Sequence, residues 1–111
     1  MLRRLILSAG VMLMVSGCLP PEDTAVADLD SDDRDRMCSR YNSEDIQCED
    51  GDKVEGISEL DCIDWAEYLA GSDCPLTIED WKDMTSDPCS DSAESSRYVL
   101  RTRCLVDGFF K

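Results

Sequence analysis

The chain has 111 residues, of which 25 are acidic, 11 are basic and none is histidine, so its formal charge at pH 7 is −14. An excess of acid of this size opposes binding to nucleic acid and to anionic lipid headgroups; it favours partners with a basic surface or serves solubility alone. Without histidine, the chain lacks the usual general base of serine and cysteine hydrolases.

The N-terminal region has the composition of an export signal. Arg3 and Arg4 precede a mostly apolar run over residues 5–15, which is a typical length for the hydrophobic region of a signal peptide. A transmembrane helix needs about 20 apolar residues, and the segment that follows this run is polar. We therefore expect residues 1–17 to be a cleaved signal peptide rather than a membrane span.

The apolar run ends in a cysteine motif, Val15, Ser16, Gly17 and Cys18, which resembles the lipobox of bacterial lipoproteins. The resemblance implies cleavage before Cys18 and acylation of its thiol and of its new amine. Two or three acyl chains anchor a protein stably, because each buried methylene contributes about 0.8 kcal/mol. Leu19 stands where many lipoproteins retained at the inner membrane of enteric-type bacteria carry aspartate, so the resemblance favours the outer membrane. The alternative is an ordinary secretory signal with a chance cysteine.

An acidic segment follows Cys18. Residues 19–36, LPPEDTAVADLDSDDRDR, contain two prolines, seven acids and almost no large apolar side chain. Such a composition buries too little surface to offset the entropy of ordering the chain. We expect residues 18–36 to form a lipidated, disordered tether that reaches at most about 60 Å when extended. Alternatively, Ser31 could cap a helix that begins within this segment.

The remaining domain, residues 37–111, carries six cysteines: Cys38, Cys48, Cys62, Cys74, Cys89 and Cys104. An even number in a small exported domain predicts three disulfides, and the sequence leaves their pairing open among 15 arrangements. A zinc site fits poorly, because the chain has neither histidine nor a Cys-x-x-Cys pair. A core this small roughly balances chain entropy, so crosslinks of about 2 to 4 kcal/mol each decide whether the domain folds.

Two segments, ISELDC and LTIEDW, share the pattern of a helix N-terminus, with a cap at Ser58 or Thr77 and an aspartate three positions later. They predict helices over residues 59–70 and 78–85. The buried stripes of these helices would carry Cys62, Trp65, Ala66 and Leu69, and Ile78, Trp81 and Met84. An earlier helix, over residues 32–41, would present Met37, Cys38 and Tyr41.

Two other segments leave the secondary structure open. Asp50 and Gly51 are typical of a two-residue hairpin turn, but Glu49 and Asp52 would then face each other as like charges, so hairpin and open loop are alternatives. Residues 97–106 alternate like a strand and also continue an upstream helical pattern, and the lack of a partner strand favours the helix. The sequence thus predicts a mainly α, small disulfide-rich domain with loop-rich connections and at most a short β-hairpin.

The segment CPLTIEDWKDMTSDPC, which runs from Cys74 to Cys89, resembles a pattern in small cysteine-rich lipoproteins of uncharacterised function from Gram-negative bacteria. That resemblance implies no activity. A glycosidase needs two carboxylates about 5 to 9.5 Å apart in a cleft, and a small domain leaves little room for one. We therefore expect no catalytic site.

Metal and cofactor sites are also not expected. An EF-hand-like start at Asp28 fails because Asp33 stands in the position of the required glycine and Ser39 in that of the bidentate glutamate. A looser calcium site is the alternative, formed by Glu49, Asp50 and Asp52.

Aromatic side chains are the remaining candidates for a binding surface. Trp65, Tyr68 and Trp81 could form a ligand platform, but each tryptophan lies on the apolar stripe of its predicted helix, which favours core packing. Phe109 and Phe110 either fold back into the core or, if exposed, form a partner contact.

These features predict a non-catalytic envelope lipoprotein, anchored through acyl chains on Cys18, whose domain binds an envelope protein with a basic surface or another envelope component. The alternative is a structural spacer, or a protein linked to peptidoglycan through Lys111, which resembles the C-terminal lysine of the major murein lipoprotein. The long coiled coil of that family is missing. A periplasmic enzyme, or an inhibitor of one, is the third possibility.

Overall fold

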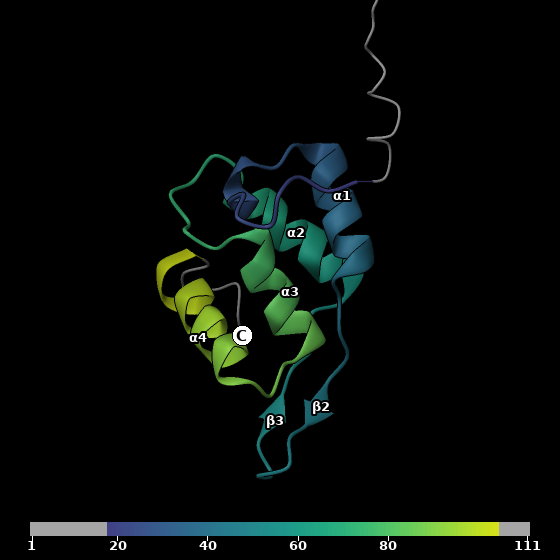
Figure 1. Ribbon diagram of the computed structural model, residues 1–111, viewed down its shortest axis with the longest axis vertical. Helices are drawn as coiled ribbons and strands as arrows, with labels where there is room; N and C mark the ends of the chain where they lie inside the picture. Colours follow the sequence, from purple (N-terminus) through teal and green to yellow (C-terminus); the bar gives the residue numbers. More distant parts are fainter. Residues whose placement is uncertain (1–17, 105–111) are drawn as a thin grey trace, which may run out of the picture.

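Figure 1 shows the computed structural model, which describes residues 18–104. Within this range the elements, in chain order, are η2 (Val26–Asp28), α1 (Ser31–Arg40), β2 (Ile46–Gln47), β3 (Lys53–Val54), α2 (Glu59–Leu69), α3 (Ile78–Ser86), α4 (Asp91–Val99) and the π-helical turn η3 (Leu100–Cys104). The mainly α, disulfide-rich fold with one short hairpin is confirmed. The expected signal peptide, Val15 to Gly17 of the lipobox, Phe109, Phe110 and Lys111 lie outside the described residues.

The helices begin where local capping chemistry predicts. The Ser58 hydroxyl accepts a hydrogen bond from the Asp61 amide (3.1 Å) at the start of α2. Thr77 and Asp80 form a reciprocal capping box at the start of α3, with bonds of 3.2 and 3.0 Å. Each bond satisfies a backbone N–H that has no partner inside its helix. Helix α1 differs in its cap, which is Asp30 rather than Ser31.

The core lies where the helices meet. Its largest fully buried side chains include Trp81, Met37, Leu69 and Ile78. Helix α2 packs on α1, and α3 packs on α4, so that α2 and α3 occupy the middle of the body in Figure 1. The predicted stripes are confirmed at Cys62, Ala66, Leu69, Ile78, Trp81 and Met84, whereas Trp65 is only half-buried.

Residues 97–106, for which the sequence leaves strand and helix as alternatives, are helical up to Cys104. Helix α4 begins after Ser90, whose hydroxyl accepts from the Ala93 amide (3.0 Å). The helix then widens into η3, which ends at Cys104. Residues 105 and 106 of the ambiguous segment lie outside the described part.

The hairpin is present, with a turn one residue longer than Asp50 and Gly51 alone predict. Ile46 pairs with Val54 and Gln47 with Lys53, and the Cys48 amide donates to the Asp52 carbonyl (2.8 Å). This register leaves three residues in the loop, the last of which is Gly51 with a φ of +94°. A three-residue loop that ends in a left-handed glycine is a common hairpin connection. Because Asp52 faces Cys48, the expected repulsion between Glu49 and Asp52 across the hairpin does not arise.

Three disulfides join elements that are distant in sequence: Cys38–Cys62, Cys48–Cys89 and Cys74–Cys104. Their Cα–Cα distances of 5.5, 5.7 and 5.1 Å lie in the range that disulfide geometry requires. The first links α1 to α2, the second ties the hairpin to the start of α4, and the third fastens the end of η3 to the loop before α3.

The structure differs from the expected disordered tether over residues 18–36. Val26 and Leu29 are buried in the core, and α1 starts at Ser31. Backbone hydrogen bonds join this segment to the start of α3: the Ile78 amide donates to the Thr24 carbonyl (3.0 Å), and the Val26 amide donates to the Leu76 carbonyl (2.9 Å). The folded unit therefore begins well before residue 37, because a distant partner supplies the contacts that the local composition lacks.

An ion pair reinforces the same contact. The Lys82 ammonium lies 3.3 Å from the Glu22 carboxylate, and the hydrogen bond to Glu22 raises the pKa of Lys82. The Glu79 amide also donates to the Glu22 carbonyl (3.0 Å). Thus backbone carbonyls of the N-terminal segment satisfy amides of the first turn of α3 that would otherwise lack partners.

Replacement of Val26 by alanine tests whether this segment belongs to the folded domain. We expect V26A to lower the free energy of unfolding by about 2 kcal/mol, because it removes buried methyl groups and leaves a cavity. Denaturant unfolding with the disulfides intact measures the loss. The matched control is D23A, at an exposed position, which should change stability by less than about 0.5 kcal/mol. Equal stability of the two variants would mean that the segment is a tether after all.

Peptide mapping tests the disulfide connectivity. Cleavage of the unreduced protein after basic residues and after Glu67 separates all six cysteines. We expect three crosslinked peptide pairs by mass spectrometry, which carry Cys38 with Cys62, Cys48 with Cys89, and Cys74 with Cys104. Any other pairing, or alkylation of one of these cysteines before reduction, would contradict the structure.

Candidate functional site

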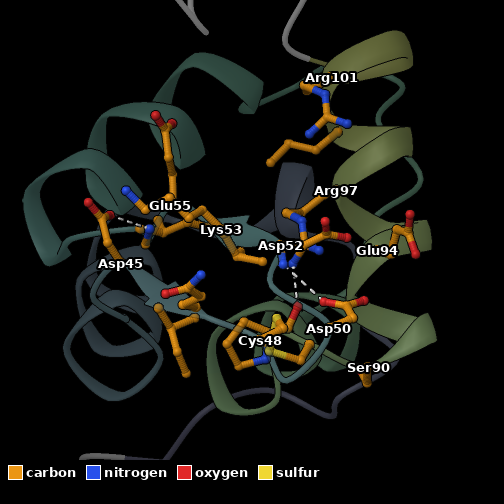
Figure 2. A pocket seen from close by; sticks show the side chains of 18 of the residues that line it. Asp45, Cys48, Asp50, Asp52, Lys53, Glu55, Ser90, Glu94, Arg97 and Arg101 are labelled. Atoms are coloured by element: carbon orange, nitrogen blue, oxygen red, sulfur yellow. Dashed lines mark hydrogen bonds between the residues drawn. A yellow bond between two sulfur atoms is a disulfide. The ribbon is translucent and has the colours of Figure 1, made fainter.

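A cleft of about 830 Å³ lies between the hairpin and the α4–η3 helix (Figure 2). One wall is the hairpin with the residues that follow it, and the other wall is α4 with the start of η3. Trp65 of α2, together with the buried Ile57 and Leu100, lines the apolar part of the cleft. Figure 1 shows the hairpin projecting from the end of the body opposite to the entry of residue 18.

Covalent and backbone contacts hold the hairpin wall in place. The Cys48–Cys89 disulfide ties the hairpin to the chain just before α4. At the base of the hairpin, the Ser43 amide donates to the Ile57 carbonyl (2.8 Å), and the Ile57 amide donates to the Ser43 hydroxyl (3.0 Å). Gly56 lies against the backbone of Glu44 so closely that a Cβ would overlap it. The wall is therefore fixed at both ends.

Basic side chains reach into the cleft from both walls. Arg97 and Arg101 extend from the helical side and Lys53 from the hairpin (Figure 2). Arg97 donates to the Pro88 carbonyl (2.9 Å), which holds its side chain in place. None of the three cations forms a salt bridge with a carboxylate among the described residues. The cleft thus holds three cations that make no direct salt bridge within the described part of the fold.

The arginine on α4 is in a costly environment. Burial lowers the pKa of Arg97, and the nearby charge of Arg101 lowers that pKa further, while Glu94 acts in the opposite direction. Arginine nevertheless stays protonated in proteins. An anion bound between the two guanidinium groups would act against both causes, because its negative charge attracts the two cations and raises the pKa of Arg97.

Carboxylates form the rest of the polar lining: Asp45, Asp50, Asp52, Glu55 and Glu94. Two of them have structural roles, since Asp45 accepts from the Gly56 amide (2.8 Å) and Asp50 accepts from the Asp52 amide (3.0 Å). Both bonds stabilise the hairpin and its turn. The cleft is therefore lined by charges of both signs, with cations and acids on both walls.

The hydroxyl in the cleft has a structural role as well. Ser90 donates to the Asp87 carbonyl (2.8 Å) and accepts from the Ala93 amide. Both contacts belong to the cap of α4, so this hydroxyl is engaged in the fold rather than oriented by a base. Over residues 18–104, no group of three or more Cys, Asp or Glu side chains is arranged to hold a metal ion.

The residues proposed from the sequence do not converge on one site. Cys18 is exposed and lies outside the three disulfides. Trp81 is buried in the core, and Trp65 lines the cleft. Tyr68, on the same helix, is 51% exposed and does not line the cleft. The three aromatic side chains therefore do not form one platform.

Sequence analysis did not predict the arginines of the cleft. Arg97 and Arg101 stand four positions apart, which places them on one side of a helix, and this spacing was an available signal. The spacing brings the two side chains together only in a helix, and they line a cleft only because the hairpin faces that helix.

Comparisons with known protein families, with curated proteins and with solved structures gave no match. No helix within residues 18–104 is long and apolar enough to cross a membrane.

Proposed function

We propose that the chain is a lipid-anchored lipoprotein of the cell envelope, with the outer membrane favoured, and that its domain is a non-catalytic binding module that uses the cleft. The observation that carries the anchoring is the state of Cys18, which is exposed while the other six cysteines pair with one another. A thiol in this position is accessible for the acylation that the lipobox resemblance implies. The three disulfides support export, because such frameworks persist in oxidising compartments.

The N-terminal segment supports a binding module over a spacer. Leu19, the residue after Cys18, already packs against the core, and Pro21 accepts a hydrogen bond from the Thr24 amide (3.0 Å). An anchor on Cys18 would therefore hold the domain close to the membrane surface, without the reach that a long tether gives. Because the hairpin projects from the opposite end of the body (Figure 1), the cleft would remain accessible from the side away from the membrane.

Replacement of Cys18 by serine tests the anchoring. We expect the native protein to be heavier than its processed polypeptide by the mass of its acyl chains, and to partition into the detergent phase. C18S should lose both properties, because stable anchoring needs the buried acyl chains. The matched control is D23A, which changes an exposed residue of the same segment and should behave like the native protein. A native protein with the bare polypeptide mass would refute the anchoring.

Site-specific photocrosslinking in intact cells separates a binding module from a spacer. A photoreactive residue in place of Gln47, which lines the cleft, should give a discrete adduct whose yield saturates. The control position is Leu60, which is 74% exposed and lies outside the cleft. Equal and unsaturable labelling at both positions would favour the spacer.

A further inference from the structure

We infer that the cleft binds short peptides that carry both a free terminal carboxylate and an amino group, with the carboxylate held between Arg97 and Arg101. This inference rests on the binding role proposed above for the same cleft and names the chemistry of its ligand.

The arginine pair identifies the acidic end of the ligand. Arg97 and Arg101 both line the cleft, and neither has a salt-bridge partner among residues 18–104. The chain has more than twice as many acids as bases, so carboxylates are plentiful, yet none of the described ones occupies this place. Guanidinium groups bind carboxylates through paired, charge-assisted hydrogen bonds. Capture of a terminal carboxylate is an established way to recognise peptides.

The acidic lining limits the charge of that anion. Glu94 lies one turn before Arg97 on the same wall, and Asp50 and Asp52 face the helix from the hairpin. These carboxylates repel a doubly charged phosphate more strongly than a singly charged carboxylate. The cleft should therefore prefer a carboxylate to inorganic phosphate.

Two acids of the lining provide a place for the amino end of the ligand. Glu55 and Glu94 line the cleft on opposite walls, and neither forms a salt bridge with another residue of the described part of the chain. An ammonium group near either acid would gain a favourable charge interaction, which a second carboxylate on the ligand would lose. A zwitterionic peptide therefore matches the lining better than an acidic one.

The size and the apolar part of the cleft fit a short peptide. Its volume of about 830 Å³ falls in the range of pockets that hold small ligands. The half-buried ring of Trp65, with Ile57 and Leu100, offers apolar surface between the charged groups. Peptide Cα and Cβ atoms could lie against this surface while the two ends reach opposite charges.

The test uses the full-length protein in detergent and the tripeptide Lys-Ala-Ala with a free C-terminus. Binding is followed by calorimetry and by tryptophan fluorescence, in which Trp65 should respond because Trp81 is fully buried. We expect the same peptide with an amidated C-terminus, and inorganic phosphate, each to bind at least about tenfold more weakly. Equal binding of the acid and the amide, tighter binding of phosphate, or no binding of the acid at millimolar concentration would overturn the inference.

Paired variants locate the site. R101Q should weaken binding of the free acid at least about tenfold, whereas R103Q, which changes an exposed arginine two residues further on and outside the cleft, should leave it unchanged. Equal affinity of R101Q and R103Q would contradict the assignment. If R101Q failed to fold, the comparison of acid and amide on the native protein would still decide the matter. Loss of peptide binding would leave the Cys18 anchor intact, and a protein without acyl chains could still bind the peptide, so the two proposals fail separately.

Discussion

The disulfides are the constraint on which the rest of the structure depends. Each closes a long loop, with sequence separations of 24, 41 and 30 residues, and in the chain-entropy account loops of this size contribute roughly 3 to 4.5 kcal/mol each to stability. A domain this small gains little from its apolar core beyond the entropy it loses. The core therefore depends on Cys38–Cys62 and Cys74–Cys104, and the cleft depends on Cys48–Cys89. Oxidation is thus a condition for the proposed binding surface and not only for stability.

The contact between the N-terminal segment and α3 determines what an anchor on Cys18 would do. The carbonyls of Glu22 and Thr24 accept from first-turn amides of α3, and Val26 is fully buried. Because residues 22–26 are used in this way, they are not available as a spacer. If Cys18 carries the proposed anchor, the domain and the anchor would form one unit, and the fold rather than a flexible linker would set the position of the cleft relative to the membrane.

The features that could be predicted from the sequence are those with a local cause. Ser58 and Thr77 cap helices through bonds to residues three positions away, so a short motif was sufficient. The hairpin turn is less strictly determined by local sequence, because Asp50 and Gly51 suit both a two-residue and a three-residue loop. The pairing of Ile46 with Val54 sets its register.

Features with a distant cause could not be predicted in the same way. Val26 and Leu29 are the only large apolar residues between Pro21 and Asp35, and their burial depends on Leu76 and its neighbours, about 50 residues further along the chain. The disulfide pairing and the meeting of the hairpin with α4 are distant in the same sense. The candidate site is built mainly from such contacts, which explains why sequence analysis found its cysteines but not its arginines.

The contacts of the other basic side chains can be compared with those of Arg97 and Arg101. Arg36 pairs with Asp33 at 3.0 Å, Lys82 pairs with Glu22, and Arg34 donates to the Leu29 carbonyl at 2.7 Å. Each of these cations holds part of the fold together, Arg36 and Lys82 through a carboxylate and Arg34 through a backbone carbonyl. Arg97 likewise donates to the Pro88 carbonyl. Arg97 and Arg101 face the cleft without a salt bridge to any carboxylate of the described residues. They keep a cost of like-charge repulsion of a few tenths of a kcal/mol, together with the partial burial of Arg97. A bound carboxylate would offset both, and on this balance the cleft is the part of the described surface best suited to a ligand.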